Sequence, residues 1–219
     1  MTCTARDYQA RCWAHGIDAG PIDNAWGPRT QAGVRALMER KGVEEPEQVF
    51  HASGLHRIIM HWTAGAYGDI AMERDAYHAL IARDGRVILG TKPPEANRSA
   101  QDGIYAQHTR WLNTGSIGVA VDAMADAREV PFDWGSAPVT RAQIDGLARA
   151  VADFAETYDI PVSRYSTLTH AEVQPTLGVR QRWKWDITVL PGMTKPGDPV
   201  AVGDAIRERV TEALVALAE

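Results

Sequence analysis

The chain has 219 residues and a mass of 24.0 kDa, which suffices for one full-sized domain with a small appendage and excludes two large domains. Hydrophobic residues make up 45% and charged residues 23%, which is typical of a soluble globular protein and excludes disordered, collagen-like and coiled-coil chains. The net charge of −5, with no local basic cluster, provides no attraction for polyanions, so we expect no nucleic-acid partner. The longest apolar runs fall far short of the roughly 20 residues that span a bilayer, so no membrane insertion is expected.

The N-terminus lacks the basic start and apolar stretch of a secretory signal, which predicts synthesis in the cytoplasm. The two cysteines are Cys3 and Cys12. On one helix they would lie about 13 Å apart, beyond the reach of a disulfide bond, so both are expected to be free thiols.

Residues 1–50 are predicted to form a small helical module. A helix over residues 4–14 is followed by a turn-rich segment, and Pro28 then lies where proline is favoured, in the first turn of a second helix. Gly42 is a typical terminator of that helix, and a third short helical segment is expected over residues 46–52. The core of such a module is thin, so we expect it to pack against the rest of the protein.

After residue 54 the pattern changes to strands that alternate with helices. Strands are expected over residues 55–62, 77–82, 86–89, 117–121 and 166–169. Asp84-Gly85 lies between two apolar runs, which is the strongest short-range signal for a β-hairpin. Helices are expected over residues 69–75, 140–158 and 204–217. This alternation predicts an α/β (α+β) domain over residues 55–219, with a central mixed sheet flanked by helices.

The clearest helical signal covers residues 140–158. Thr140 and Gln143 have the spacing of a capping box, and Pro161 lies just beyond the end of the helix. An apolar stripe follows the helical period at Ile144, Leu147, Val151, Phe154 and Tyr158.

Two of the seven histidines, His61 and His170, each close a predicted strand. Both imidazoles can therefore project from one end of the sheet, which is where open α/β sheets place ligand sites. A zinc site needs three protein donors and an open fourth position, and Asp186 is a candidate carboxylate donor. From spacing alone, a structural role for each histidine at a strand end remains the alternative.

Four sequence blocks carry a more specific signal. They are Ile59-Met-His-Trp-Thr-Ala-Gly65, Tyr77-His-Ala-Leu-Ile-Ala-Arg-Asp-Gly-Arg-Val87, His108 with Asn113-Thr-Gly-Ser-Ile-Gly-Val119, and Thr169-His170 with Lys184-Trp-Asp186. In this order they resemble the blocks of the zinc-dependent N-acetylmuramoyl-L-alanine amidases of the type-2 amidase family, which includes amidase-type phage lysozymes and peptidoglycan recognition proteins. The resemblance covers roughly residues 55–195.

The resemblance implies that His61, His170 and Asp186 bind Zn²⁺. Lys184 matches the family lysine that stabilises the negative charge developing on the attacked carbonyl oxygen; a surface lysine is the alternative interpretation. Tyr77 matches a tyrosine of the phage-type members that orients the zinc-bound water or the substrate; a core tyrosine is the alternative.

Trp62, His108 and Asn113 are expected to bind substrate, with a surface loop position as the alternative for His108. The implied reaction is hydrolysis of the amide between N-acetylmuramic acid and L-alanine by a zinc-activated water. A muramidase would need two carboxylates, and the strand-end blocks contain no obvious pair. Ala120 stands where many members carry a glutamate as possible general base, which favours the phage branch and leaves the proton acceptor open.

The third ligand position departs from the family pattern. The gap from His170 to Asp186 is longer than the usual spacing, which an insertion over residues 175–180 explains, and Ile187 replaces the usual proline. Glu172 is therefore the alternative oxygen ligand.

Residues 20–30, with the following helix, resemble the three-helix peptidoglycan-binding domain whose signature is Asp-Gly-x-x-Gly-x-x-Thr. Asn24 takes the place of the first glycine and tolerates the left-handed turn conformation. Trp13 and Trp26 can stack on sugars or pack in the core. Such a module raises the local concentration of an enzyme on its polymer.

These resemblances predict a monomeric, bacteriolytic, endolysin-like zinc amidase with peptidoglycan as its partner. It would be made in the cytoplasm, released by a separate membrane-permeabilising protein, and active on the cell wall. A non-catalytic peptidoglycan recognition protein of the same fold is the first alternative. A zinc peptidase acting on another amide is the second, and the resemblance over residues 20–30 argues against it.

Overall fold

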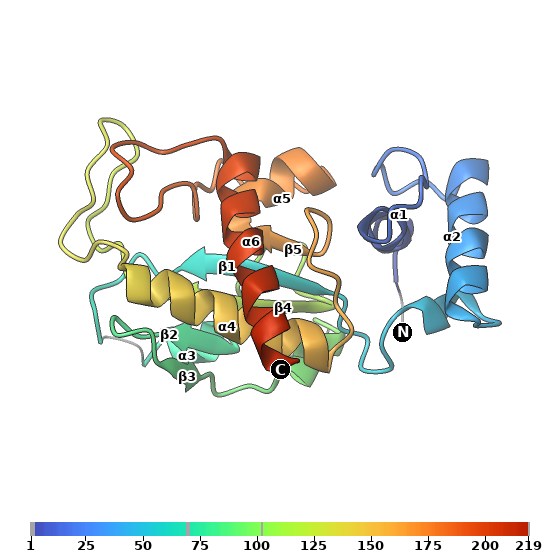
Figure 1. Cartoon of the computed structure of the whole chain (residues 1–219), viewed down its shortest axis with the longest axis horizontal. Helices are drawn as coiled ribbons and strands as arrows, with labels where there is room; N and C mark the ends of the chain where they lie inside the picture. Colours follow the sequence, from blue (N-terminus) through green and yellow to red (C-terminus); the bar gives the residue numbers. More distant parts are fainter. Residues whose placement is uncertain (1–2, 69–70, 102, 219) are drawn as a thin grey trace.

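The computed structural model describes residues 3–68, 71–101 and 103–218 of the chain (Figure 1). Within these residues one sheet has the strand order β3-β2-β4-β1-β5. Its strands are β1 (Arg57–Trp62), β2 (Ala79–Ile81), β3 (Val87–Leu89), β4 (Ser116–Val121) and β5 (Thr167–Thr169). β3 is antiparallel to β2, and the other neighbouring pairs are parallel. The predicted mixed sheet and its hairpin are therefore confirmed.

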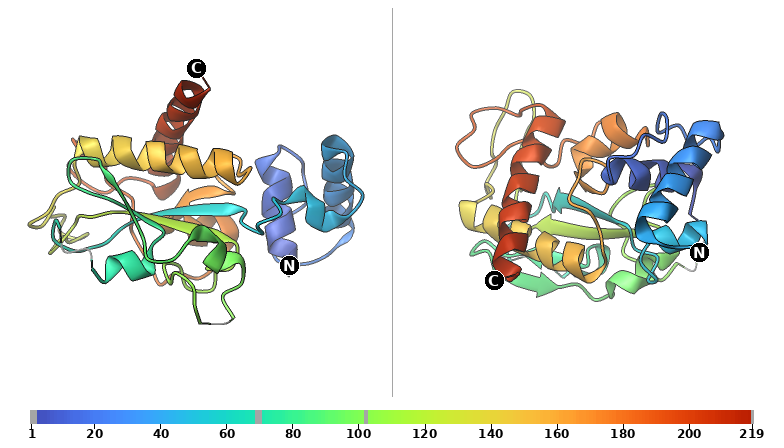
Figure 2. Two further views of the ribbon diagram at one scale, coloured as in Figure 1. Left: turned by 90° about the horizontal axis from the view of Figure 1, so that it is seen from below. Right: turned by 45° about the vertical axis from the view of Figure 1, so that its right-hand side comes forward.

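Two long helices cover one face of the sheet: α4 (Arg141–Thr157) and α6 (Pro199–Leu217) (Figure 1, Figure 2). They bury Ile58 and Met60, which alternate along β1 with residues that point to the other face. The predicted capping box of α4 is present, because the Thr140 and Gln143 side chains each accept a hydrogen bond from the other's backbone N–H.

The opposite face carries a helix that the sequence analysis did not anticipate, α5 (His170–Leu177). It begins with a capping box between Thr169 and Glu172 and ends at Gly178 in the left-handed conformation. The region expected to be an insertion thus starts as an ordered helix. A second apolar cluster lies beneath it, formed by Ala10, Ile59, Leu112, Leu168, Val173, Leu177 and Val179.

Some predicted helix boundaries were wrong. α6 begins before the expected residue 204, because Asp198 accepts a hydrogen bond from the Ala201 N–H and caps it earlier. The helix expected over residues 69–75 begins only at residue 73, and residues 69–70 lie outside the described residues. Two short helices complete this part: α3 (Glu73–Ala76) and η2 (Pro94–Arg98). In the part of the chain that the structure describes, no helix is long and apolar enough for a membrane span.

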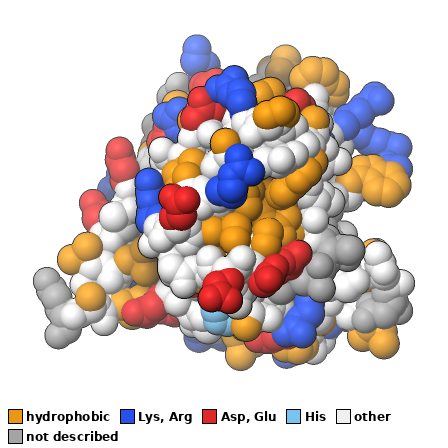
Figure 3. Space-filling model, turned by 90° about the vertical axis from the view of Figure 1, so that its right-hand side faces the viewer, with side chains coloured by type: hydrophobic (Ala, Val, Ile, Leu, Met, Phe, Trp, Pro, Cys, Tyr) orange, Lys and Arg blue, Asp and Glu red, His pale blue; other side chains and the backbone are white. Residues whose placement is uncertain are grey.

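The N-terminal segment folds into short helices, α1 (Ala5–Ala14), α2 (Pro28–Lys41) and the 3₁₀ helix η1 (Pro46–Val49). They share a small apolar cluster made of Tyr8, Cys12, Ala19, Val34, Leu37, Val49 and Phe50. As predicted, Gly42 ends α2 in the left-handed conformation, Asn24 adopts it too, and both cysteines are free thiols. The third segment is shorter than the expected residues 46–52. Figure 3 shows the face on this side of the molecule, where apolar side chains gather among charged ones.

These helices lie beside the end of the sheet where β1 begins, and buried polar contacts join them to it (Figure 1, Figure 2). The Arg11 guanidinium, 2% exposed, donates to the Val49 carbonyl and to both the carbonyl and the carboxylate of Asp159, beyond the end of α4. Arg57 of β1 forms an ion pair with Asp7 of α1. The N-terminal helices are therefore bonded to the sheet and to the segment that follows α4.

Candidate metal centre

The site lies where β1 and β5 end, on the face opposite α4 and α6. His61 is the penultimate residue of β1, and His170 follows β5 directly as the first residue of α5. The two strands are parallel neighbours with Met60 opposite Thr169, so the next residue of each strand places an imidazole at the same edge. The structure thus brings together the two histidines that the sequence pattern singled out.

Asp186 completes the cluster from the loop after α5. Its Oδ2 lies 3.0 Å from His61 Nδ1 and 3.1 Å from His170 Nδ1. One donor atom from each of the three residues lies within 4.8 Å of the other two, and all three residues are buried. Two imidazole nitrogens and a carboxylate oxygen form the donor set of many catalytic zinc sites.

The remaining imidazole nitrogens have partners that favour this arrangement. His170 Nε2 lies 2.9 Å from Gln181 Oε1, and the Gln181 amide nitrogen donates to the Arg110 carbonyl at 2.8 Å. Because Gln181 therefore presents its oxygen, which can only accept, His170 carries a proton on Nε2. His61 Nε2 lies 3.3 Å from the Thr109 hydroxyl. Such outer contacts orient metal-ligating histidines, so the residues present fit a zinc ion.

The charges also suit a cation. Burial lowers the pKa of His61 to about 4, although the Asp186 carboxylate opposes the shift. For Asp186 itself, burial favours the neutral acid, but the imidazoles of His170 and His61 outweigh it and hold the pKa well below its ordinary value. At neutral pH the cluster therefore offers a carboxylate and a neutral imidazole, the forms that bind metal.

An open cleft of about 700 Å³ lies over this cluster. Among its lining residues are His170, Asp186 and the five other residues expected from the sequence, Trp62, Tyr77, His108, Asn113 and Lys184. Four exposed cations also line it: Arg110, Arg180, Arg182 and Lys184. Asp186 is the one carboxylate among the described lining residues. The cleft is thus electropositive in a protein of net negative charge.

Tyr77 and His108 flank His61, with ring centroids 5.2 and 5.4 Å from its ring. Burial raises the pKa of Tyr77 well above its ordinary value and lowers the pKa of His108 well below its own, so both rings are neutral at physiological pH. His108 is buried, which excludes the surface loop position considered for it.

Trp62 and Asn113 have structural contacts as well as a place in the cleft. The Trp62 ring packs edge-on against Trp185, with centroids 4.6 Å apart, and belongs to the core beneath α4 and α6. The Asn113 side-chain oxygen accepts hydrogen bonds from the backbone N–H groups of His108 and Thr109. Asn113 therefore holds the loop that carries His108.

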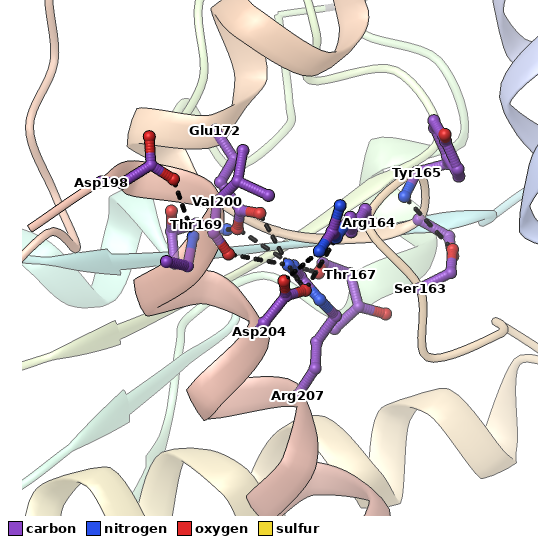
Figure 4. Close-up of polar contacts among 12 residues, drawn as sticks. Ser163, Arg164, Tyr165, Thr167, Thr169, Glu172, Asp198, Val200, Asp204 and Arg207 are labelled. Carbon is purple, nitrogen blue, oxygen red and sulfur yellow. Dashed lines mark hydrogen bonds and ion pairs between the residues drawn. The ribbon is translucent and has the colours of Figure 1, made fainter.

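Glu172, the alternative oxygen ligand, lies elsewhere. Its carboxylate accepts hydrogen bonds from the Thr169 backbone N–H and from the Arg207 guanidinium, as Figure 4 shows. The structure therefore does not bring Glu172 to the two histidines. Sequence reasoning also missed Thr109 and Gln181 as partners of the imidazoles. The signal that was visible in the sequence concerns Glu172, because the spacing Thr169-x-x-Glu172 is that of a capping box, in which the carboxylate bonds to the backbone.

Residues 52–192 match the sequence family described as N-acetylmuramoyl-L-alanine amidase (Amidase_2). No curated protein matches the chain significantly. One similar solved structure is the N-acetylmuramoyl-L-alanine amidase LysC from Clostridium intestinale URNW, with 16% identity over 74% of this chain and 89% of that chain and a TM-score of 0.42.

Two further similar structures are of proteins described as an amidase and as a peptidoglycan recognition protein. The amidase AmiD from E. coli, in complex with anhydro-N-acetylmuramic acid-L-Ala-D-gamma-Glu-L-Lys, shares 18% identity over 53% of this chain and 48% of that chain, with a TM-score of 0.39. Drosophila peptidoglycan recognition protein SD shares 14% identity over 68% of this chain and 86% of that chain, with a TM-score of 0.40.

Proposed function

This chain belongs to the N-acetylmuramoyl-L-alanine amidase family, and we propose that it is a zinc-dependent enzyme that cleaves the amide between N-acetylmuramic acid and L-alanine in peptidoglycan. The observation that carries the zinc assignment is the convergence of His61, His170 and Asp186 beneath an open cleft. Their donor types, burial and outer hydrogen bonds all suit this ion.

The residues around the cluster have distinct tasks in this reaction. A zinc ion, when bound, supplies Lewis-acid polarisation of the amide carbonyl and activation of water. Lys184 supplies a positive charge on the cleft wall, which stabilises the oxygen that becomes negative as the carbonyl is attacked. Tyr77 keeps its hydroxyl proton, because burial raises its pKa, and can donate a hydrogen bond to substrate.

The cationic lining also suits the substrate. Stem peptides carry carboxylates, and Arg180, Arg182 and Arg110 form no ion pair within the described residues, so they are available to such groups. Trp62 and His108 border the same space. We assign these residues to substrate binding.

The proposal extends to a role as an endolysin. Residues 1–50 would bind the cell wall and residues 55–219 would catalyse hydrolysis, in a monomer that a separate membrane-permeabilising protein releases from the cytoplasm to the murein layer. What supports the wall-binding role is the resemblance over residues 20–30, including Asn24 in the left-handed conformation that the signature requires. A non-catalytic recognition protein remains the alternative, and the complete donor set argues against it.

The decisive test is mass spectrometry of purified peptidoglycan after incubation with the protein, with and without a zinc chelator. Release of intact stem peptides with a free L-alanine amine, lost with chelator and restored by added Zn²⁺, is the expected result. Binding to the sacculus without release would favour the recognition protein. Release that the chelator does not affect would contradict the zinc assignment.

A further inference from the structure

A network of ion pairs centred on Arg207 joins it to Glu172 and Asp204 (Figure 4). Arg207 of α6 donates from Nη1 and Nη2 to the two carboxylate oxygens of Glu172, at 3.0 and 2.8 Å. Glu172 is fully buried, and the Arg207 side chain is 7% exposed. The pair thus joins α6 to the first turn of α5.

The same two side chains hold the backbone on the N-terminal side of His170. Glu172 Oε2 accepts the Thr169 N–H at 2.8 Å, and Arg207 Nη1 donates to the Thr167 carbonyl at 2.8 Å. The strand residues that lead into His170 and the helical turn that follows it are therefore fixed to one guanidinium. His170, the proposed metal ligand, lies between these contacts in the chain.

Asp186 depends on the same turn. Its backbone carbonyl accepts a hydrogen bond from the Ala171 N–H at 2.6 Å. A displacement of the first turn of α5 would therefore move two of the three donor residues, His170 and Asp186. His61 is on β1 and would stay in place, so the distances between the donor atoms would change.

The close packing of α6 against Glu172 depends on a glycine. A Cβ on Gly203 would lie 2.0 Å from Glu172 Oε2, so a glycine is required for α6 to pack this closely. Asp204, one residue later, accepts hydrogen bonds from Arg207 and from Arg164. Its carboxylate therefore also pairs with the positive charge of Arg164. α6 thus brings a matched acid and base to the junction between β5 and α5.

From these contacts we propose that Arg207 is a positioning residue for the metal centre: through Glu172 and the Thr167 carbonyl it sets the location of His170, and through the same turn that of Asp186. The inference rests on the proposed function. A buried ion pair often adds little stability over apolar packing, whereas a metal site needs its ligands held within about 0.5 Å. We therefore assign to the Arg207–Glu172 pair the task of fixing the positions of His170 and Asp186.

The test compares wild type with the double variant Glu172→Leu, Arg207→Met, which removes both charges and leaves neither buried alone. Zinc affinity is measured by competition with a chromophoric chelator, coordination by the absorption spectrum of the Co²⁺ form, and stability by urea unfolding of the zinc-free protein. The expected loss of zinc affinity is about 10- to 100-fold, with an altered Co²⁺ spectrum and little change in stability. The control, Arg164→Met, removes an ion pair of the same network that does not contact the junction, and should keep wild-type affinity.

Arg207→Lys provides a second variant if the double variant does not fold. Lysine keeps the charge but cannot bridge Glu172 and the Thr167 carbonyl with a planar fork, so an intermediate loss of zinc affinity is expected. Wild-type affinity and Co²⁺ spectrum in the folded variants would overturn the positioning role while leaving the proposed function intact. Absence of zinc binding by the wild type would overturn both.

Discussion

A single oxygen of Asp186 faces both imidazoles, which makes this residue the centre of the candidate site. We predict that Asp186→Ala abolishes hydrolysis and lowers zinc affinity at least about 100-fold, because a charged ligand is lost and two donors remain. The fold should persist, since most buried contacts of the sheet lie outside the cluster. Peptidoglycan digestion measures the hydrolysis, zinc titration measures the affinity, and circular dichroism shows whether the fold persists. Wild-type turnover in a folded variant would refute the ligand assignment.

Lys184 lines the same cleft, and among the described residues no hydrogen bond or ion pair joins its side chain to the three donor residues, so its role is separable from theirs. We expect Lys184→Met to lower kcat about 100- to 1,000-fold, as loss of a charge that stabilises an oxyanion does, with unchanged zinc affinity. Lys195→Met is the control, because Lys195 is exposed and lies outside the cleft lining. A kcat equal to that of the control variant would assign Lys184 to the surface instead.

Regular elements could be predicted from the sequence because their signals are local. The stripe and capping box of α4 and the Asp84-Gly85 hairpin need only near neighbours to form. The helix α5 escaped prediction because it is short and contains Pro175, although Thr169 and Glu172 have capping-box spacing. Local signals therefore define the sheet and the long helices.

The surroundings of the site follow a different rule. His61 and His170 could be identified because they end adjacent parallel strands. Gln181 and Arg207 could not be identified in this way. Gln181 reaches His170 from the loop after α5, and Arg207 reaches the junction between β5 and α5 from a helix 40 residues away; no periodicity encodes either contact. Asp186 was a candidate from the sequence, and the resemblance to a family made it the expected third ligand; only the folded structure shows that the Glu172 carboxylate is bonded to Arg207.

The cap of α4 allows a test at the level of one element. The Thr140 hydroxyl accepts the Gln143 N–H and donates to the Arg83 carbonyl, so it also ties the helix to the loop after β2. Thr140→Ala should lower the free energy of unfolding by about 1–2 kcal/mol without changing zinc affinity. Urea denaturation measures the first and chelator competition the second. Thr157→Ala, at the exposed end of the same helix, should cost less than half as much; equal losses would show that the cap is not the cause.

At the scale of the whole molecule, the N-terminal helices are attached by more than a linker. Ala10 joins the apolar cluster beneath α5, the Arg11 guanidinium reaches Asp159, and Asp7 pairs with Arg57 of β1. A tether would allow the first 50 residues to move independently of the cleft, whereas these contacts hold them in one orientation. We therefore expect the two regions to unfold together.

Asp7 makes that coupling measurable through pH. Burial favours its neutral form, but the contacts with His56 and Arg57 outweigh this and hold the pKa of Asp7 far below its ordinary value. A depressed carboxyl pKa stabilises the fold above about pH 4, the unfolded value, and this stabilisation is lost as the pH falls further. Asp7→Asn should therefore cost about 3 kcal/mol at pH 7 and lose less additional stability than wild type between about pH 4 and 2. Urea unfolding followed by tryptophan fluorescence and by circular dichroism should give one coincident transition at each pH. Identical pH slopes in the two proteins would refute the ion pair of Asp7, and separate transitions in wild type would mean that the N-terminal helices are only tethered.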